Sequence, residues 1–315
     1  MVRSEPKTEI INPIYNKEDS VTVVFSFDEE FCKYFSVTLQ SIIDNANHYT
    51  KYDLIILYSQ IAKDTKEKLY TQLPENFSLR FFDMPSILSG YFPEIELNEH
   101  GRWPREVFYR LFIPLMMRKY KKVLYLDSDL VSEIDIQDLY KQKFDGKKLI
   151  AIKDTAAHLF HIESYQARKY YMKNDLGIED ETLYFNSGVL LFNIEAIEPT
   201  SYRCTIKKDL KTEKLLFPDQ DLLNKIFQND VKFISKEWNY CCGEFIYNKY
   251  FLDMIDDKHR DEILKAKATP KIIHYTSTYK PWNSTLKDHF NRFWHSARKS
   301  PFYEELLLEK TLEET

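Results

Sequence analysis

The stretch KKVLYLDSDLV, residues 121–131, runs from a short apolar segment directly into two carboxylates separated by one serine. Residues 123–126 are apolar without a break, which is typical of a strand buried on both faces. One aspartate at a strand end is ordinary, because its side chain can bond nearby backbone amides. Two are harder to explain. In an extended chain residues i and i+2 point the same way, so the like charges of Asp127 and Asp129 would lie side by side.

A pair of neighbouring carboxylates costs free energy unless a positive group lies between them. A hard divalent cation meets this need, since Mg²⁺ and Mn²⁺ prefer oxygen ligands and often bridge carboxylates to substrate phosphates. From this stretch alone, an ordinary strand end and a metal site are both open interpretations.

The composition narrows the class of protein. The chain has 315 residues, is 43% hydrophobic and 30% charged, and is therefore globular, with room for one large or two ordinary domains. With only 6 glycines it contains no glycine-rich phosphate loop, so side chains and a metal would have to hold any nucleotide. The net charge of -5 is spread along the chain, which excludes a basic footprint for duplex nucleic acid.

The cysteines and the apolar runs bear on the compartment. The 4 cysteines form no C-x-x-C pattern, and Cys241 and Cys242 are adjacent, which suits two packed thiols better than a disulfide. The first twenty residues have no apolar signal core, and no apolar run reaches the length of a membrane span. These features predict a reducing, cytoplasmic setting.

The order of the predicted elements indicates an α/β fold. Strands at 21–27, 52–59 and 79–83 alternate with helices at 31–45 and 63–73, which predicts a mostly parallel sheet. Later strands are expected at 123–126, 149–154, 184–194, 231–235 and 271–276, later helices at 104–120, 161–172 and 217–227, and irregular structure at 84–103. We see no repeat and no flexible linker, so one compact domain is expected over residues 21–282, after an extension of residues 1–20.

The tail, residues 283–315, predicts an amphipathic helix in which aromatic and basic side chains alternate. They are Phe290, Phe293, Trp294, Lys287, Arg292, Arg298 and Lys299. Such a helix either docks on its own domain or lies on an anionic membrane surface. The second alternative would make the protein peripheral to the inner face of a membrane.

Polar residues follow the predicted strands at the places where those strands end. In open α/β sheets, ligands bind outside the carboxyl ends of the strands. The residues that would gather there are Asp28, Asp127, Asp129, Asp154, Asn186, Ser187 and His274. Singly, each also suits a cap, a turn or a core histidine, but one histidine with two carboxylates is a plausible set for one divalent ion. Lys280 could place an ammonium against phosphates there, or could be an ordinary solvated lysine.

Six segments carry a resemblance to a known family. In chain order they are VTVVFSFDEEF, the helix with Arg110, VLYLDSDLV, YFNSGVLLFN, FPDQDLLN and IIHYTSTYKPW. Together they resemble glycosyltransferase family 8, the retaining transferases that use nucleotide sugars on a GT-A fold, and the resemblance covers about residues 21–282. It implies a Rossmann-like, mostly parallel sheet flanked by helices. It also implies transfer of a hexose, glucose or galactose, from a UDP-sugar to a glycan, lipid-linked or protein-linked acceptor, with Mn²⁺ or Mg²⁺ as cofactor.

The resemblance also implies roles for matching positions. The implied metal ligands are Asp127, Asp129 and His274. The implied donor-binding residues are Ser26 and Asp28 near the uracil, Arg110 and Ser128 towards the sugar and phosphates, Asn186 at the sugar, and Lys280 on the diphosphate. The implied catalytic residues around the sugar are Asp154, Asp219 and Gln220.

The sequence departs from the family pattern at two places. Ser277 stands where members usually have a glycine that lets backbone approach the phosphate, so we expect a different or looser loop. Glu30 and Phe31 stand where many members have Asn and Tyr, which affects the base and ribose contacts.

Retention of configuration leaves two routes open, a double displacement and a front-face reaction. The first needs a carboxylate nucleophile beneath C1, and Gln220 is a neutral amide. In the second, the leaving phosphate accepts the acceptor's proton. We assign Gln220 to positioning and electrostatic support.

Two other functions compete with the transferase. DSDLV also fits a haloacid-dehalogenase-type phosphatase, which would form an aspartyl-phosphate at Asp127, although that motif is expected on an early strand. A non-catalytic UDP-sugar-binding protein would bind the donor without transferring sugar. For the acceptor we expect loops at 84–103 and 236–251, because Trp238, Tyr240 and Tyr247 offer aromatic faces to sugar rings. Ordinary loop packing would explain these residues equally well.

Overall fold

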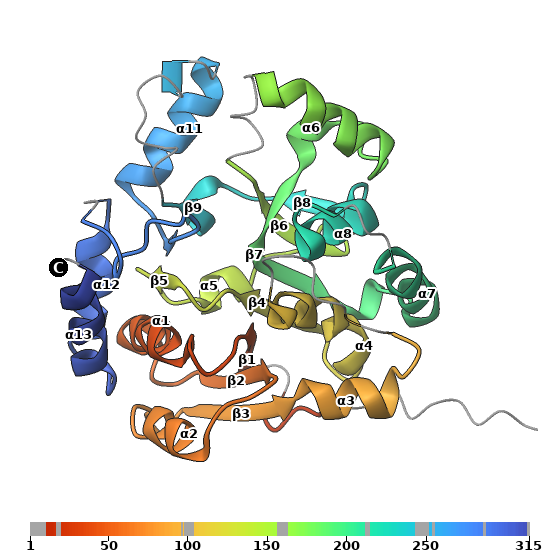
Figure 1. The fold of residues 1–315 in the computed structure, drawn as a ribbon. Helices are drawn as coiled ribbons and strands as arrows, with labels where there is room; N and C mark the ends of the chain where they lie inside the picture. The colour runs from red at the N-terminus through yellow and green to blue at the C-terminus, as the bar shows by residue number, and fades with distance from the viewer. Residues whose placement is uncertain are drawn as a thin grey trace, which may run out of the picture.

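The computed structural model describes residues 11–16, 20–95, 97, 104–155, 163–211, 215–242, 252–253, 256–285 and 288–313. Within these ranges, a seven-stranded sheet forms the centre of the molecule and a three-stranded sheet lies beside it, with helices around both (Figure 1). The predicted α/β architecture is confirmed.

The large sheet is mostly parallel, as predicted, with one exception. Its spatial order is β3 (Phe77–Asp83), β2 (Lys51–Tyr58), β1 (Ser20–Ser26), β4 (Lys122–Leu126), β7 (Phe185–Asn193), β6 (Leu149–Lys153) and β8 (Val231–Phe233). Strand β7 runs antiparallel to both β4 and β6, and Leu126 at the end of β4 pairs with Val189 in the middle of β7. The first residues of β7 therefore lie at the carboxyl end of β4, where Asp127 and Asp129 follow.

The small sheet was not predicted. It consists of β5 (Leu130–Ser132), β10 (Ile272–His274) and β9 (Tyr240–Cys241). Strand β10 pairs antiparallel with β5, which places His274 opposite Leu130, and parallel with β9, which places His274 opposite Cys241. Because Leu130 directly follows Asp129, this pairing brings a residue from far along the chain to the DSD segment.

Alternating side chains of β4 divide the core into two layers. Leu124 and Leu126 pack towards the layer that contains α1, and Val123 and Tyr125 towards the layer that contains the helices before β4 and after β7. The first layer includes α1 (Cys32–Asn45), α2 (Lys63–Tyr70) and α5 (Gln137–Tyr140). The second includes α3 (Met84–Tyr91), η1 (Arg105–Phe112), α4 (Ile113–Met116), α7 (Pro199–Asp209) and α8 (Pro218–Phe227).

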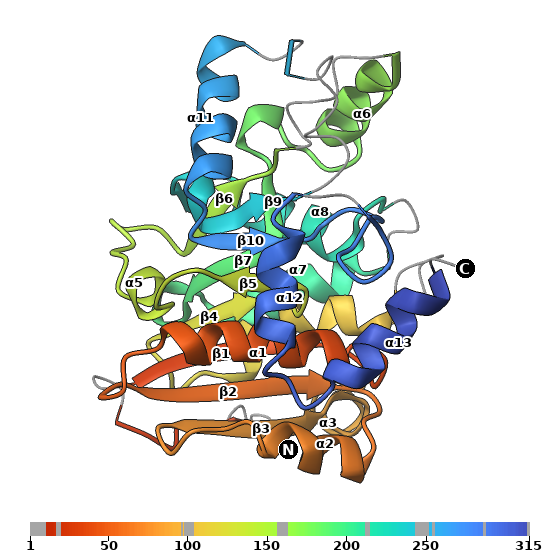
Figure 2. The same cartoon turned by 90° about the vertical axis from the view of Figure 1, so that its left-hand side faces the viewer.

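The remaining helices lie outside these two layers or join them. They are α6 (Glu163–Asn174), η3 (Glu181–Leu183), η4 (Ile194–Ala196), η5 (Lys236–Asn239), α11 (Asp257–Ala268), α12 (Phe290–Ala297) and α13 (Tyr303–Glu313). Figure 2 shows α12 and α13 beside α1 and below α6 and α11.

Two local predictions were wrong. The segment 104–120 is not one α-helix but the 3₁₀-helix η1 followed by the short α4. Pro114 has no N–H to donate to the carbonyl of Arg110, and that carbonyl instead accepts from Ile113. Residues 84–91 are helical rather than irregular, because Asp83 caps α3 by accepting from the Ser86 amide and Pro85 suits its first turn.

The tail docks on its own domain. The aromatic side of α12 is buried: Phe293 is 1% exposed and its ring lies 5.1 Å from that of Trp282. The indole N–H of Trp294 donates to the Pro281 carbonyl, and Arg292 forms an ion pair with Glu133. The aromatic face of α12, which could otherwise have bound a membrane surface, is therefore buried against the rest of the protein. Among the described residues, no helix has the length and apolar character needed to cross a membrane.

Replacing Phe293 by alanine tests this docking. We expect Phe293→Ala to lower the free energy of unfolding by about 3–5 kcal/mol, because it removes a fully buried ring. Leu308→Ala on α13 is the control, since Leu308 is 63% exposed and its loss should cost no more than about 0.5 kcal/mol. Denaturant unfolding curves would measure both. Equal stabilities of the two variants would contradict a docked α12.

Candidate active site

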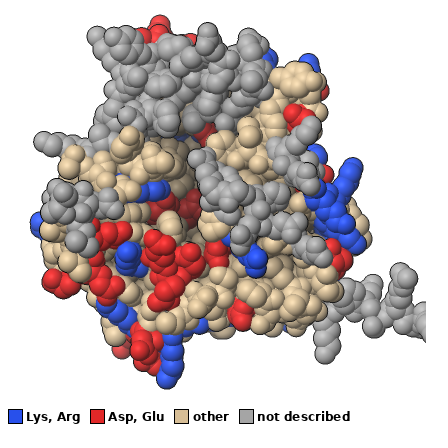
Figure 3. Space-filling model, viewed as in Figure 1, with Lys and Arg blue, Asp and Glu red and all other residues tan. Residues whose placement is uncertain are grey.

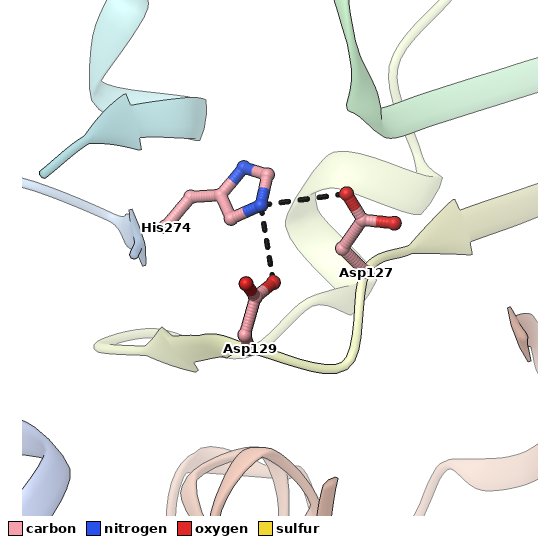
Figure 4. A group of neighbouring side chains, drawn as sticks. All are labelled: Asp127, Asp129 and His274. Atoms are coloured by element: carbon pink, nitrogen blue, oxygen red, sulfur yellow. Dashed lines mark ion pairs between the residues drawn. The ribbon is translucent and has the colours of Figure 1, made fainter. Parts of the chain in front are cut away.

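The centre of the site is formed by Asp127, Asp129 and His274 (Figure 4). Nε2 of His274 lies 3.4 Å from Oδ2 of Asp127 and 3.2 Å from Oδ1 of Asp129. One ligand atom from each residue lies within 4.8 Å of the other two, so the three side chains could hold a metal ion. The structure therefore brings together the histidine and the two carboxylates that the sequence analysis grouped.

Three cations of the protein compensate the two carboxylates. His274 contacts both, Arg110 forms an ion pair of 2.9 Å with Asp127, and Lys280 forms one of 2.6 Å with Asp129. Burial alone would raise the pKa of Asp129, but Lys280 and His274 hold it below its usual value. Burial alone would lower the pKa of His274, but the carboxylates raise it well above its usual value. The charged forms of these side chains are thus favoured by their partners in spite of burial.

Tyr125 stabilises the carboxylate of Asp127 by a hydrogen bond. Its hydroxyl donates to Oδ1 of Asp127 at 2.8 Å and lies 3.0 Å from Oγ of Ser26. The guanidinium of Arg110 lies over the Tyr125 ring, 4.4 Å from its centroid. Tyr125 was not predicted to belong to the site, although it lies two residues before Asp127 and therefore points to the same face of the strand. Ser26, implied to lie near the uracil, is in contact with this network.

Arg110 connects the metal-ligand candidates to the first turn of α8. It is 5% exposed, and its Nε lies 3.1 Å from Oδ2 of Asp219 while its NH2 contacts Asp127. It also donates to the carbonyl oxygen of Ser187 at 2.8 Å. Burial raises the pKa of Asp219 above its usual value in spite of the nearby Arg110 charge. The guanidinium thus holds two carboxylates and the start of β7 together.

The three implied catalytic residues meet around Ser187. The Gln220 side chain donates from Nε2 to Oδ2 of Asp154 at 3.0 Å, and its Oε1 accepts from the Ser187 amide at 2.9 Å. The Ser187 hydroxyl donates to Asp219 at 3.0 Å. All four residues are buried. Their polar atoms therefore form one connected set beside the carboxylate pair.

Gly188 lets the backbone of β7 approach the carboxylates closely. Its carbonyl accepts from the Asp127 amide at 2.8 Å. A Cβ at this position would lie 2.2 Å from Cε1 of His274 and 2.6 Å from Oδ2 of Asp127, well inside contact distance. Only glycine fits here without displacing these two side chains.

Asn239 was missed by the sequence analysis. Its Oδ1 lies 3.0 Å from Nδ1 of His274, and its Nδ2 donates to Oδ1 of Asn186 at 2.9 Å. The same Asn186 oxygen accepts from the Gly188 amide at 2.9 Å. No spacing rule points to Asn239, because η5 and β10 are far apart in the sequence.

The structure also describes three further predicted residues, of which Lys280 contacts the centre directly. Asp28 accepts from the Phe31 amide at 3.1 Å, at the start of α1. Ser128, which lies between the two aspartates in the sequence, is buried, and its carbonyl accepts from the Thr38 hydroxyl. Besides Asp129, the ammonium of Lys280 contacts the carbonyl of Tyr275.

The side chain of Ser277 stabilises its own loop by hydrogen bonds to the backbone. Its hydroxyl donates to the Tyr279 carbonyl and accepts from the Tyr279 amide, both at 3.0 Å. Ser277 does not use the left-handed backbone region, since only Asp145 and His289 do so among the described non-glycine residues. A serine is therefore accommodated without backbone strain.

Two of the three expected acceptor aromatics are not available to a sugar. Trp238 and Tyr240 are buried, the first under Lys271 and the second with its hydroxyl on Asp288. Ordinary packing explains both, and Tyr247 lies outside the described residues.

The face shown in Figure 3 is hollowed near its centre, with acidic side chains at the floor of the hollow.

Several relatives of this chain are named as glycosyltransferases, and others carry different names. A lipopolysaccharide 1,2-glucosyltransferase of Escherichia coli is 25% identical over 296 residues, which are 89% of this chain and 79% of that protein. General stress protein A of Bacillus subtilis is 21% identical over 278 residues, 86% of this chain and 90% of that protein.

Solved structures share the fold. The bifunctional glycosyltransferase WbbM matches with a TM-score of 0.82 and 27% identity over 98% of this chain, which spans about half, 54%, of WbbM. The galactosyltransferase LgtC, solved with donor and acceptor sugar analogs, matches with a TM-score of 0.67 and 22% identity, over 89% of this chain and 96% of LgtC. The family model for glycosyl transferase family 8 matches residues 22–286, so the chain belongs to glycosyl transferase family 8 and has the GT-A fold of these neighbours.

Proposed function

We propose that this glycosyltransferase is a retaining, Mn²⁺-dependent enzyme that transfers glucose or galactose from a UDP-sugar. The observation that carries the proposal is the group of Asp127, Asp129 and His274, with Lys280 in contact with it, at the carboxyl end of β4. This is the place where an open α/β sheet binds its ligands. The match to the glycosyl transferase family 8 model covers most of the chain and argues against the phosphatase alternative.

The residues present fit a hard divalent ion. Two carboxylate oxygens and one imidazole nitrogen converge, a donor set that suits Mn²⁺ and also Mg²⁺. Because Gly188 has no side chain, His274 and Asp127 can lie against its backbone and converge on one point. Such an ion would stabilise the negative charge that develops on the diphosphate as the sugar C1–O bond breaks.

The chain's own residues would bind and orient the donor. Lys280 already reaches Asp129, and the same ammonium would hold a diphosphate oxygen. Asp28 at the end of β1 would contact the uracil. Asp154 and Asp219 would bind sugar hydroxyls, while Arg110 keeps Asp127 and Asp219 in place.

Gln220 would act by positioning. Its amide nitrogen donates to Asp154 and its amide oxygen accepts from the Ser187 backbone, and these two bonds support an orienting role. The structure places no carboxylate alone in this group: Asp219 is paired with Arg110 and Asp154 with Gln220.

For the acceptor we propose a glycan or glycolipid. The relatives that are named as lipopolysaccharide glucosyltransferases support this class. The buried aromatic face of α12 offers no support for a membrane contact through the tail.

UDP release from a panel of UDP-sugars tests the proposed activity. We expect slow hydrolysis of UDP-glucose or UDP-galactose with Mn²⁺, and its loss with EDTA and in Asp129→Asn, which keeps the shape of the side chain but not its charge. Asp145→Asn is the control, since this exposed aspartate pairs with Lys232 away from the site and should be as active as the wild type. Donor binding without release, even with acceptor glycans added, would identify a non-catalytic binder. Release that is insensitive to EDTA would contradict the metal.

Gly188→Ala tests the space beside the metal ligands. We expect it to weaken Mn²⁺ binding and to lower the free energy of unfolding by about 1–3 kcal/mol, because the new methyl group collides with His274 and Asp127. Gly90→Ala on α3 is the matched control, since its Cβ would meet no atom within 4 Å. Mn²⁺ titration followed by electron paramagnetic resonance and thermal unfolding would report both effects. Unchanged Mn²⁺ affinity in Gly188→Ala would show that the metal does not bind between these residues.

Gln220→Ala tests the positioning role. We expect kcat to fall by about 10²-fold, because Asp154 and the Ser187 amide lose their common partner and the reacting geometry loosens. Gln228→Ala, just after the same helix, should leave kcat unchanged, as its side chain only contacts the Lys225 carbonyl. Steady-state transfer rates would separate the two. Full activity in Gln220→Ala would exclude the assigned role.

A further inference from the structure

Asn239 lies between the candidate metal site and the residues assigned to the donor sugar. It is the last residue of η5, directly before β9, and it is 1% exposed. Its amide oxygen faces Nδ1 of His274 and its amide nitrogen faces Asn186. Neither contact belongs to a local turn, since the partners are 35 and 53 residues away in the sequence.

The direction of each hydrogen bond follows from one backbone group. The Gly188 N–H is a donor only, and it lies 2.9 Å from the Asn186 side chain, which must therefore present its oxygen. That oxygen also contacts the Asn239 side chain at 2.9 Å, which must present its NH₂ group. The Asn239 oxygen is then left for His274, at 3.0 Å, and can only accept.

This series of hydrogen bonds fixes the orientation of the His274 imidazole ring. Because the Asn239 oxygen accepts, Nδ1 of His274 carries a hydrogen and donates it. The ring cannot turn over without losing this bond, since His274 is 3% exposed and packed against Gly188. Nε2 is then the nitrogen that faces Asp127 and Asp129, where a metal ion would need it.

We propose that Asn239 is a positioning residue of the active site. It holds His274 with Nε2 directed at the two aspartates, and through Asn186 it ties this orientation to the donor-sugar side of the site. The role of Nε2 as a metal ligand rests on the function proposed above; the orientation of the ring does not. Outer partners of metal-binding histidines commonly fix the tautomer in this way, and their loss typically lowers metal affinity by about 10- to 100-fold.

Three variants separate the contributions of the amide. Asn239→Leu has a similar size and removes both bonds. Asn239→Asp keeps an oxygen that accepts from His274 but cannot donate to Asn186. Asn193→Leu is the matched control: it removes an asparagine bond to the Lys147 carbonyl at the far end of β7. If Asn239→Leu does not fold, Asn239→Ala replaces it.

Two measurements test the inference independently. In metal-free protein labelled with ¹⁵N-histidine, the His274 Nδ1–H should give a proton signal protected from exchange with water, assigned by its absence in His274→Gln. We expect the signal to persist in Asn239→Asp and Asn193→Leu and to vanish in Asn239→Leu. Mn²⁺ titrations followed by electron paramagnetic resonance should show roughly 10- to 100-fold weaker binding in Asn239→Leu, near wild-type binding in Asn239→Asp, and an unchanged affinity in Asn193→Leu.

The outcomes distinguish this inference from the proposed function. A protected Nδ1–H signal or undiminished Mn²⁺ affinity in Asn239→Leu would overturn the positioning role. If the wild type binds no Mn²⁺, the proposed cofactor is wrong, and the proton signal alone decides whether Asn239 orients His274. Donor kinetics provide a further check: Asn239→Asp should raise KM for the UDP-sugar more than it lowers Mn²⁺ affinity, because only the bond to Asn186 is lost. An unchanged KM would refute the proposed link to the donor side.

Discussion

The repulsion between Asp127 and Asp129 is the constraint on which the rest of the site depends. Two ionised carboxylates held side by side in a buried place are unfavourable unless cations compensate them. In the structure His274 contacts both, and Arg110 and Lys280 each contact one. Each of these cations comes from a different part of the chain, so the fold has to bring η1, β10 and the loop after β10 to the end of β4.

The strand topology achieves this with one reversed strand and one small sheet. Because β7 runs antiparallel to β4, its first residues and the start of the nearby α8 lie where β4 ends. Because β10 pairs with β5, His274 lies opposite the residue that follows Asp129. Gly188 then allows the backbone of β7 to approach His274 of β10 closely. A fully parallel sheet would have placed Asn186 and Ser187 at the opposite edge from the carboxylates.

The sequence predicts the parts of this arrangement that depend on local patterns. Apolar runs located the strands of the large sheet to within a few residues, and the D-x-D spacing identified the carboxylate pair. The direction of β7 and the pairing of β10 with β5 depend on contacts between distant residues, which no local pattern encodes. For the same reason Tyr125 and Asn239 were missed: a tyrosine in a strand and an asparagine at the end of a short helix look ordinary until their partners are in place. The failure at 104–120 was local, because Pro114 already argued against one continuous helix.

Buried polar networks stabilise a site only when every member is satisfied, since an unpaired buried donor or acceptor costs about 1–3 kcal/mol. Here backbone groups fix the polarity of the side chains, because an N–H can only donate. The Gly188 amide sets the direction from Asn186 through Asn239 to His274. The Ser187 amide sets the direction from Gln220 to Asp154. Two successive amides of β7 therefore orient the histidine on one side and the catalytic candidates on the other. A change in the position of β7 would disturb both sides at once, which gives a physical reason for the proposed metal and donor sites to respond to each other.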